Sequence, residues 1–307
     1  MVEEGCRLNV KWSLQELSRV INGDGKSSPN PLFRVKVTLI GDKIEFSPSL
    51  KKLANMVSNI AEQLIVCTKN IQRLPDILTP EKSNKEAIYA IISRDDEIRK
   101  IQNAILTGLA SNATHVQNYL TKWDNYRDIW EVNKEAFIRR YQNLNPPVSS
   151  FDADIARYTE VGNNVSKEET VLNIQFVLLD CSPLKAALHH HCSLWQNKFT
   201  SLLSEMATTR LKELHEFLYT NSENLKAPPQ SLSHLSESLA LLEQLQLDLP
   251  KIESKFGPLH DQFAVLEKYE VEVPADVSNY SVNLNLLSTT IGEIKFITNM
   301  QINIQEN

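Results

Sequence analysis

Glycine is scarce in this chain, with only eight residues among 307. Because glycine supplies the positive backbone angles of many tight turns, its scarcity favours long helices over numerous short strands. Basic residues are not in excess either, since 32 Lys and Arg residues stand against 38 Asp and Glu residues, a formal net charge of −6. Surfaces that bind nucleic acid normally show a basic excess, so the composition predicts no nucleic-acid partner.

Long apolar runs and paired cysteine motifs are also missing. No window approaches ~18 consecutive apolar residues, so the sequence predicts no membrane span and no membrane partner. The first ten residues, MVEEGCRLNV, are acidic and lack the apolar core of a secretory signal. Cys6, Cys67, Cys181 and Cys192 show no CxxC spacing. We therefore expect free thiols in a reducing compartment, and a soluble protein of the cytoplasm.

Alternating apolar and polar residues mark the segment LFRVKVTLIGDKIEFSPSL near the N-terminus. The alternation begins at Phe33, is interrupted by the turn signal Gly41-Asp42, and resumes as far as Phe46. This pattern predicts a β-hairpin with one buried face.

Helical patterns flank this hairpin. The helix expected over residues 10–21 has its apolar positions at Trp12, Leu14, Leu17, Val20 and Ile21. After the hairpin, Ser47-Pro48 predicts the capped start of a helix that runs to about Leu74. Its expected apolar face consists of Leu50, Leu53, Val57, Ile60, Leu64 and Cys67.

The longest apolar stripe predicts a single helix from about residue 98 to 144, a rod of roughly 70 Å at about 1.5 Å per residue. Its members step by three and four: Ile98, Ile101, Ile105, Leu109, Asn112, Val116, Tyr119, Trp123, Tyr126 and Trp130, followed by Phe137, Tyr141 and Leu144. Six aromatic residues between Tyr119 and Tyr141 fall in or beside this stripe. We therefore expect them to pack in a helical seam rather than to form a stacking platform for bases.

Further helices are expected downstream. A shorter one, with Ser150 as its cap, carries Phe151, Ile155 and Tyr158 inward, and TVLNIQFVLLD reads as a strand or extended connector. Ser182-Pro183 opens a long helix with the stripe Leu184, Leu188, His191, Trp195, Phe199, Leu202 and Met206, continuing loosely through Leu214, Phe217 and Leu225. Pro228-Pro229 closes it. A leucine-rich helix follows, and Asp248-Leu249-Pro250 restarts the chain as a last helix that Pro258 should kink.

These patterns predict a mainly α protein, an elongated array of long antiparallel helical bundles with one N-terminal β-hairpin. We expect residues 1–80 to hold the first helix, the hairpin and the first long helix. Residues 81–227 should form a long-helix bundle, and residues 228–275 a helical hairpin. Residues 276–307 differ in character, because VNLNLL and MQINIQ alternate with little charge.

Two clusters of residues have side chains of the types found in phosphate-binding and metal-binding sites. Gly25-Lys26-Ser27 fits the end of a phosphate-binding loop, but the glycine that such a loop needs five residues earlier is Val20. The second cluster gathers Cys181, His189, His190, His191 and Cys192. Adjacent histidines on a helix point about 100° apart and cannot converge on one ion. We expect a loop at the first cluster, and at the second His191 packed in the seam beside solvated neighbours.

Carboxylate pairs give no active site either. Asp95-Asp96 and Asp152 with Asp154 are expected at helix starts, where they complement the helix dipole. The sequence therefore predicts no catalytic, cofactor-binding or metal-binding residue, and no cofactor.

Four segments together resemble the tail (stem) of an axonemal dynein heavy chain, just ahead of its linker and motor. They are NPLFRVKVTLIGDKIEFSPSL, YLTKWDNYRDIWEVNKEAFIRRY, FVLLDCSPLKAALHHHCSLWQNKF and IESKFGPLHDQFAVLEKYEVEVP. They occur in the family's order and cover roughly residues 10 to 275. After about Ala275 the sequence departs from the family's pattern of further helices.

The resemblance implies a non-catalytic tail segment that scaffolds assembly of the dynein complex and connects the cargo-docking end to the ATP-driven ring in ciliary movement. Implied partners are dynein intermediate, light-intermediate and light chains, with other heavy chains as a further possibility. The implied location is the axoneme of the cilium, within the cytoskeleton. The alternatives are a truncated part of a full-length, ATP-dependent, minus-end-directed microtubule motor, and a helical tether or adaptor unrelated to dynein.

Overall fold

The computed structural model describes residues 2–23, 30–73, 77–78, 86–227, 230–271 and 292. The chain divides into two compact units. Unit 1 comprises Met1–Val132 and Gly162–His191, and unit 2 comprises Asn133–Val161 and Cys192–Asn307. Across the described ranges, none of the helices is both long and apolar enough to cross a bilayer.

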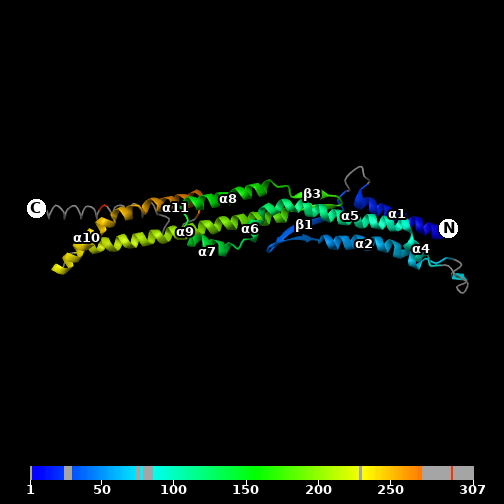
Figure 1. The fold of residues 1–307 in the computed structure, drawn as a ribbon, viewed down its shortest axis with the longest axis horizontal. Helices are drawn as coiled ribbons and strands as arrows, with labels where there is room; N and C mark the ends of the chain where they lie inside the picture. The colour runs from blue at the N-terminus through cyan, green and yellow to red at the C-terminus, as the bar shows by residue number, and fades with distance from the viewer. Residues whose placement is uncertain are drawn as a thin grey trace. The chain divides into compact units, whose positions relative to one another are not determined.

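Unit 1 is built on the helix α5 (Asp96–Leu120). The helices α1 (Val2–Asn22) and α2 (Leu50–Val66) both pack against α5, and α4 (Ile88–Arg94) leads into it (Figure 1). Asp95 caps α5, because its Oδ1 accepts hydrogen bonds from the backbone amides of Glu97 and Ile98 at 2.9 Å and 3.1 Å. Gly108 faces α1, and an added Cβ there would lie 1.9 Å from Asn22 Oδ1 and 3.1 Å from Ile21 Cγ2, so a larger residue would displace the Asn22 side chain.

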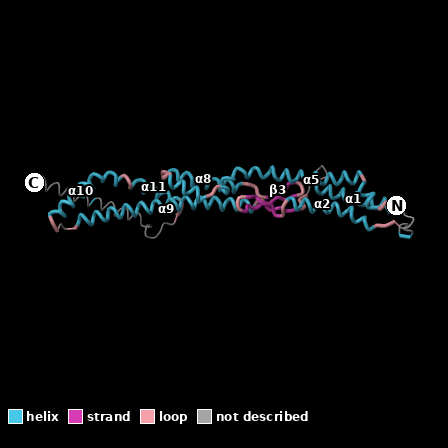
Figure 2. The backbone as a smooth tube through the Cα atoms, turned by 60° about the horizontal axis from the view of Figure 1, so that its bottom comes forward, coloured by secondary structure: helices cyan, strands magenta, loops and turns pink. Residues whose placement is uncertain are grey.

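The other part of unit 1 is a four-stranded sheet in the order β2-β1-β4-β3, drawn in magenta in Figure 2. The strands are β1 (Phe33–Ile40), β2 (Lys43–Ser47), β3 (Val171–Ile174) and β4 (Val177–Asp180). β1 pairs antiparallel with β2 and parallel with β4, and β4 pairs antiparallel with β3. Val35, Val37 and Leu179 are fully buried, so one face of the sheet forms core.

Unit 1 also includes several short helices and parts of two longer ones. They are η1 (Cys67–Asn70), η3 (Thr121–Tyr126), α6 (Arg127–Glu131), the end of α8 (Val148–Lys167) and the start of α9 (Ser182–Lys226). Glu168, the residue after α8, accepts hydrogen bonds from two residues of η3, from Lys122 Nζ at 3.2 Å and from the Tyr126 hydroxyl at 3.3 Å.

Unit 2 consists of helices in its described part. They are α7 (Lys134–Asn143), the first part of α8, most of α9, α10 (Leu232–Glu253) and α11 (Phe256–Lys268). Along α9, the buried positions from Leu203 step through Ala207, Leu211, Leu214 and Leu218. Asp152 on α8 accepts from Lys268 Nζ at 2.6 Å and from the Tyr269 hydroxyl at 2.8 Å, which fixes the end of α11.

The mainly α class and the N-terminal hairpin are confirmed, and the hairpin has the predicted turn at Gly41, whose φ is +60°. The expectation of a single hairpin is wrong. The segment read as one strand or connector is a second hairpin, β3 and β4, and it joins the first through parallel pairing. Its turn uses Gln175, a non-glycine residue with φ of 53°, so no glycine marks it in the sequence.

The predicted rod from 98 to 144 is also wrong, although much of its stripe is buried. Ile98, Ile105, Leu109, Asn112, Val116, Trp123 and Trp130 are buried as expected. The helix itself ends at Leu120, where η3 takes over, and the chain is extended at Val132. Asn133 then caps α7, because its side-chain oxygen accepts a hydrogen bond from the Ala136 amide at 3.0 Å. Asparagine is favoured at this capping position and disfavoured in the interior of a helix.

Several predicted boundaries move by a few residues. Ser49 caps α2, accepting from the Lys52 amide at 3.3 Å, because Ser47 is paired with Lys36 in the sheet. Ser150 lies inside α8 rather than at its cap.

The last two helices also differ from expectation. α10 continues through Pro250 instead of restarting there, and ends at Glu253. Pro258 falls in the first turn of α11, where its missing amide costs no helical hydrogen bond.

Some stripe positions face solvent. Trp12 is 65% exposed, because the buried face of α1 consists of Val10, Leu14 and Ile21. On α2 the buried set is Leu53, Val57, Ala61 and Ile65, so Ile60 and Cys67 are exposed. On α9, Leu184, Leu188, Trp195, Phe199, Leu202 and Leu214 are buried as predicted, but Cys192, Ala207 and Leu218 take the places expected for His191, Met206 and Phe217. The alternating segments VNLNLL and MQINIQ lie outside the described residues.

Replacing Asn112 tests the link between α5 and the sheet. Asn112 is 2% exposed, and its Nδ2 donates to the Ile174 carbonyl at 2.8 Å. Asn112→Ala should lower the free energy of unfolding by about 1–3 kcal/mol, because the Ile174 carbonyl loses a buried donor. Chemical denaturation measures the change, with the exposed Asn103→Ala on the same helix as control. Equal losses in both variants would contradict this role.

Asp180 should make stability depend on acid pH. Burial alone would raise the pKa of its carboxyl, but hydrogen bonds from Ser182 and Arg34 outweigh burial and lower it below the usual 3.8. Stability from this carboxylate is therefore present above pH 3.8 and lost as the pH falls through the lowered value.

Asp180→Asn should consequently lower the melting temperature near neutral pH, and the gap to the parent chain should narrow as the pH drops below 3.8. Thermal melts at a series of pH values measure this. The exposed Asp261→Asn serves as control. A gap that does not change with pH would show that Asp180 contributes no such dependence.

Candidate functional site

The two tryptophans that follow α5 in unit 1 form core rather than an open stacking surface. Trp123 is fully buried and Trp130 is 4% exposed. The rings of Trp123 and Tyr126 lie 6.1 Å apart at a tilted angle, and Lys122 Nζ lies 4.4 Å from the Tyr119 ring. Bases could not stack on rings in these positions, so the predicted packing role is confirmed for the two tryptophans.

A second aromatic cluster lies in unit 2, where Phe151, Trp195 and Phe199 are buried. Its members, from α7, α8 and α9, are Phe137, Tyr141, Phe151, Tyr158, Trp195 and Phe199. Phe137 meets Trp195 edge-on at 5.3 Å, and Tyr158 stacks on Trp195 at 5.2 Å. Edge-to-face and offset contacts of this kind add to the burial of apolar area.

One hydroxyl in this cluster is held by a carboxylate. The Tyr141 hydroxyl donates to Asp154 Oδ2 at 2.7 Å. Burial, the hydrogen bond and the neighbouring charge together raise the pKa of Tyr141 well above its usual value of 10.0. The phenol therefore stays protonated and holds α7 to α8.

The histidine and cysteine segment has separate roles for its members. His189 Nε2 shares a hydrogen bond with Ser166 Oγ at 2.8 Å, His190 is exposed, and His191 is half-buried. Burial raises the pKa of the Cys181 thiol to about 11 and also raises that of Cys192, which disfavours the thiolates that a metal site needs. Within the described part of the chain, no three His, Cys, Asp or Glu residues lie close enough together to hold a metal ion.

Asp95, Asp152 and Asp154 of the two carboxylate pairs cap a helix or bind neighbouring side chains. Asp95 caps α5, so its predicted position at a helix start is confirmed. Its carboxylate also forms an ion pair with Arg7 at 3.2 Å. Asp152 and Asp154 lie beyond the first turn of α8, which begins at Val148, so the helix-start expectation is wrong for them. Their partners are instead Lys268 and Tyr141. The phosphate-loop fragment Gly25-Lys26-Ser27 lies outside the described residues.

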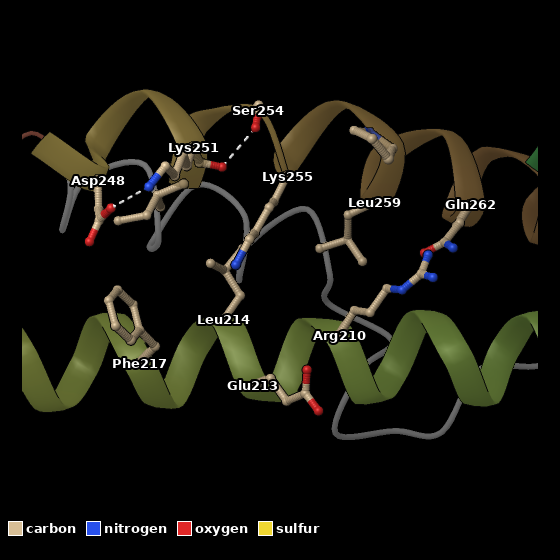
Figure 3. Close-up of a pocket in the computed structure, with 12 residues that line it drawn as sticks. Arg210, Glu213, Leu214, Phe217, Asp248, Lys251, Ser254, Lys255, Leu259 and Gln262 are labelled. Carbon is tan, nitrogen blue, oxygen red and sulfur yellow. Dashed lines mark hydrogen bonds and ion pairs between the residues drawn. The ribbon is translucent and has the colours of Figure 1, made fainter. Parts of the chain in front are cut away.

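Unit 2 contains a groove of about 720 Å³, shown in Figure 3. One wall is α9, which presents Arg210, Glu213, Leu214 and Phe217. These residues are spaced i, i+3, i+4, i+7, so they form one stripe along the helix.

The opposite wall is formed by α10 and α11. Asp248, Lys251, Ile252 and Lys255 repeat the same spacing, and Leu259 and Gln262 extend the stripe along α11 (Figure 3). The floor is apolar, because Leu214, Ile252 and Leu259 are 6%, 4% and 3% exposed.

The helical pattern of the sequence predicts Phe217 in the buried seam and therefore does not reveal this groove. In the structure the Phe217 side chain is 43% exposed and lines the groove. The adjacent Leu218 is buried instead. The only signal in the sequence is the matching spacing of charged and apolar residues on the two walls, which a single helix pattern does not reveal.

Comparison with known proteins identifies the family. The family model described as "Dynein axonemal heavy chain 2/5/8 coiled-coil" matches residues 197–287, which include all the residues that line the groove. The chain is 58% identical over 291 residues to dynein axonemal heavy chain 2 of Mus musculus and 55% identical over 291 residues to that of Homo sapiens. Each alignment covers 93% of this chain.

Similarity extends beyond mammals. The dynein-1-beta heavy chain of the flagellar inner arm I1 complex of Chlamydomonas reinhardtii is 35% identical over 287 residues, or 88% of this chain. The chain spans only 6% of the mouse and algal relatives and 7% of the human one. Identity of this degree along nearly the whole chain shows that it belongs to the axonemal dynein heavy chain family, as a segment that carries the family's coiled-coil region.

Proposed function

We propose that this chain acts as a non-catalytic tail segment of an axonemal dynein heavy chain, which supports assembly of the dynein complex in the axoneme and connects its docking end to its motor. The observation that carries the proposal is 55–58% identity to dynein axonemal heavy chain 2 proteins over 93% of a mainly helical chain. An unrelated helical tether, one of the alternatives considered from the sequence, does not account for such identity.

The packing of the chain supports a mechanical rather than a chemical role. In the described part of each unit, long helices bury their apolar stripes against neighbouring elements. Asp95 caps α5, Asp152 pairs with Lys268, and the Tyr141 phenol is hydrogen-bonded to Asp154, so these groups stabilise the fold. Helices locked by continuous apolar seams resist bending and offer long surfaces to other chains. Such a body can transmit force and hold partners without performing catalysis.

The implied partners are dynein intermediate, light-intermediate and light chains, and other dynein heavy chains. One relative's name supports a place in an assembly, because the algal dynein-1-beta heavy chain is named for the inner arm I1 complex. The alternative role, as part of an ATP-dependent microtubule motor, belongs to a longer chain that carries nucleotide-binding loops. In this sequence Val20 stands where the one partial loop motif needs a glycine.

Recovery of partners from ciliated cells tests the proposal. The full chain, carrying an affinity tag, should recover dynein intermediate chains or a dynein heavy chain, identified by mass spectrometry. A helical protein of similar length and net charge should recover neither, and serves as control for non-specific capture.

An ATPase assay on the same purified chain addresses the lack of catalysis. Phosphate release in the presence of Mg²⁺ and ATP should equal that of the buffer. Failure to recover any dynein subunit would contradict the assembly role, and ATP turnover by the purified chain would contradict the non-catalytic role.

A further inference from the structure

We propose that the groove between α9 and α10–α11 is a docking site for an amphipathic helix of a partner protein, with acidic side chains flanking an apolar stripe. The inference rests on the proposed scaffolding function, because it names the kind of partner that one surface of the segment receives. Three features of the groove carry it, namely its two matched stripes, its charge, and one buried side-chain carbonyl that accepts no hydrogen bond within the described residues.

The matched stripes fit a helix. Both walls place residues at i, i+3, i+4 and i+7, so the groove presents two parallel rows of side chains over an apolar floor. A third helix laid between such rows can insert one apolar stripe and contact both walls, as helices do in coiled coils and bundles. From Asp248 to Gln262 the wall measures about 20 Å at about 1.5 Å per residue, the length of roughly four helical turns.

The charge of the groove selects an acidic helix. Arg210, Lys251 and Lys255 line it, against the two carboxylates Glu213 and Asp248. Asp248 is already neutralised by Lys251 at 3.0 Å. The exposed Lys255 therefore offers its charge to an incoming carboxylate, although the chain as a whole carries a net charge of −6. This local excess of one positive charge, on a protein that is acidic overall, favours acidic partners.

The third feature is Gln262. Its side chain is directed into the groove toward Arg210 in Figure 3, and the residue is 2% exposed. Its Oε1 is buried and accepts no hydrogen bond within the described part of the structure. An orphaned buried carbonyl destabilises a protein, so a donor from the bound helix, such as a hydroxyl or amide, would remove this cost.

Fluorescence anisotropy with labelled helical peptides tests the docking site on the full chain. The first peptide has about 18 residues, enough to span the longer wall, with leucines at helical i, i+3, i+4 and i+7 positions, glutamates on both flanks and one central serine. The second has the same leucines and serine but lysines in place of the glutamates. We expect the acidic peptide to bind more tightly by about tenfold, against the net charge of the protein.

Two variants localise the binding. Lys255→Glu should weaken binding of the acidic peptide about tenfold, whereas Lys100→Glu, the same charge change at an exposed position of unit 1, should leave it unchanged. Gln262→Leu should raise the melting temperature of the free chain, because it removes an unsatisfied carbonyl, and should weaken peptide binding. A residue with a purely structural role would not show these opposite effects.

The proposal is overturned if neither peptide binds, if both bind equally, or if Lys255→Glu has no effect. Apparent affinity that falls as the concentration of the chain rises would instead place a second copy in the groove, and would also overturn it. These failures leave the recovery of dynein subunits untouched, so they can be told apart from failure of the proposed function.

Discussion

The parallel pairing of β1 with β4 is the constraint on which unit 1 depends. It places Phe33 opposite Val177 and Lys36 opposite Asp180, far apart in the sequence. Parallel strands need a crossover connection, and here the crossover holds every element from β2 to β3. Because the chain leaves unit 1 after Val132 and returns at Gly162, this pairing explains why the unit is assembled from two separate stretches. The ion pair of Arg34 with Asp180 at 2.7 Å lies at the same junction.

In both units, aromatic residues are among the largest fully buried side chains of the described residues. In unit 2, Trp195 and Phe199 on α9 meet rings from α7 and α8, and in unit 1 the buried Trp123 and Trp130 follow α5. Each large ring buries much area, so a small number of aromatic residues is enough to stabilise long helices. Burial of Trp123, Trp130, Trp195 and Phe199 leaves the faces of these rings unavailable for stacking with bases.

Local patterns in the sequence predicted local structure well. Strict alternation with Gly41 at the turn identified the first hairpin, and steps of three and four identified the buried face of α5 and most of that of α9. The second hairpin was missed because its turn uses Gln175 at positive φ, and its pairing with β1 is not local.

Other errors have equally physical causes. Apolar periodicity alone could not show that Asn133 would cap a new helix, or that Cys192 rather than His191 would enter the seam, because neighbouring helical positions differ by only about 100°. The groove could not be predicted from the sequence, because its two walls come from separate helices and each wall mixes charged with apolar residues.

The central claim is that this fold is a tail element of axonemal dynein, separate from the part that hydrolyses ATP. Cryo-electron microscopy of intact axonemal dynein, at a resolution that separates strands, tests it most directly. The account predicts density for the sheet β2-β1-β4-β3, beside a helix with the buried face of α5, in the tail and outside the nucleotide-binding ring. Finding that sheet within the ring, or finding no such sheet in the tail, would contradict the account.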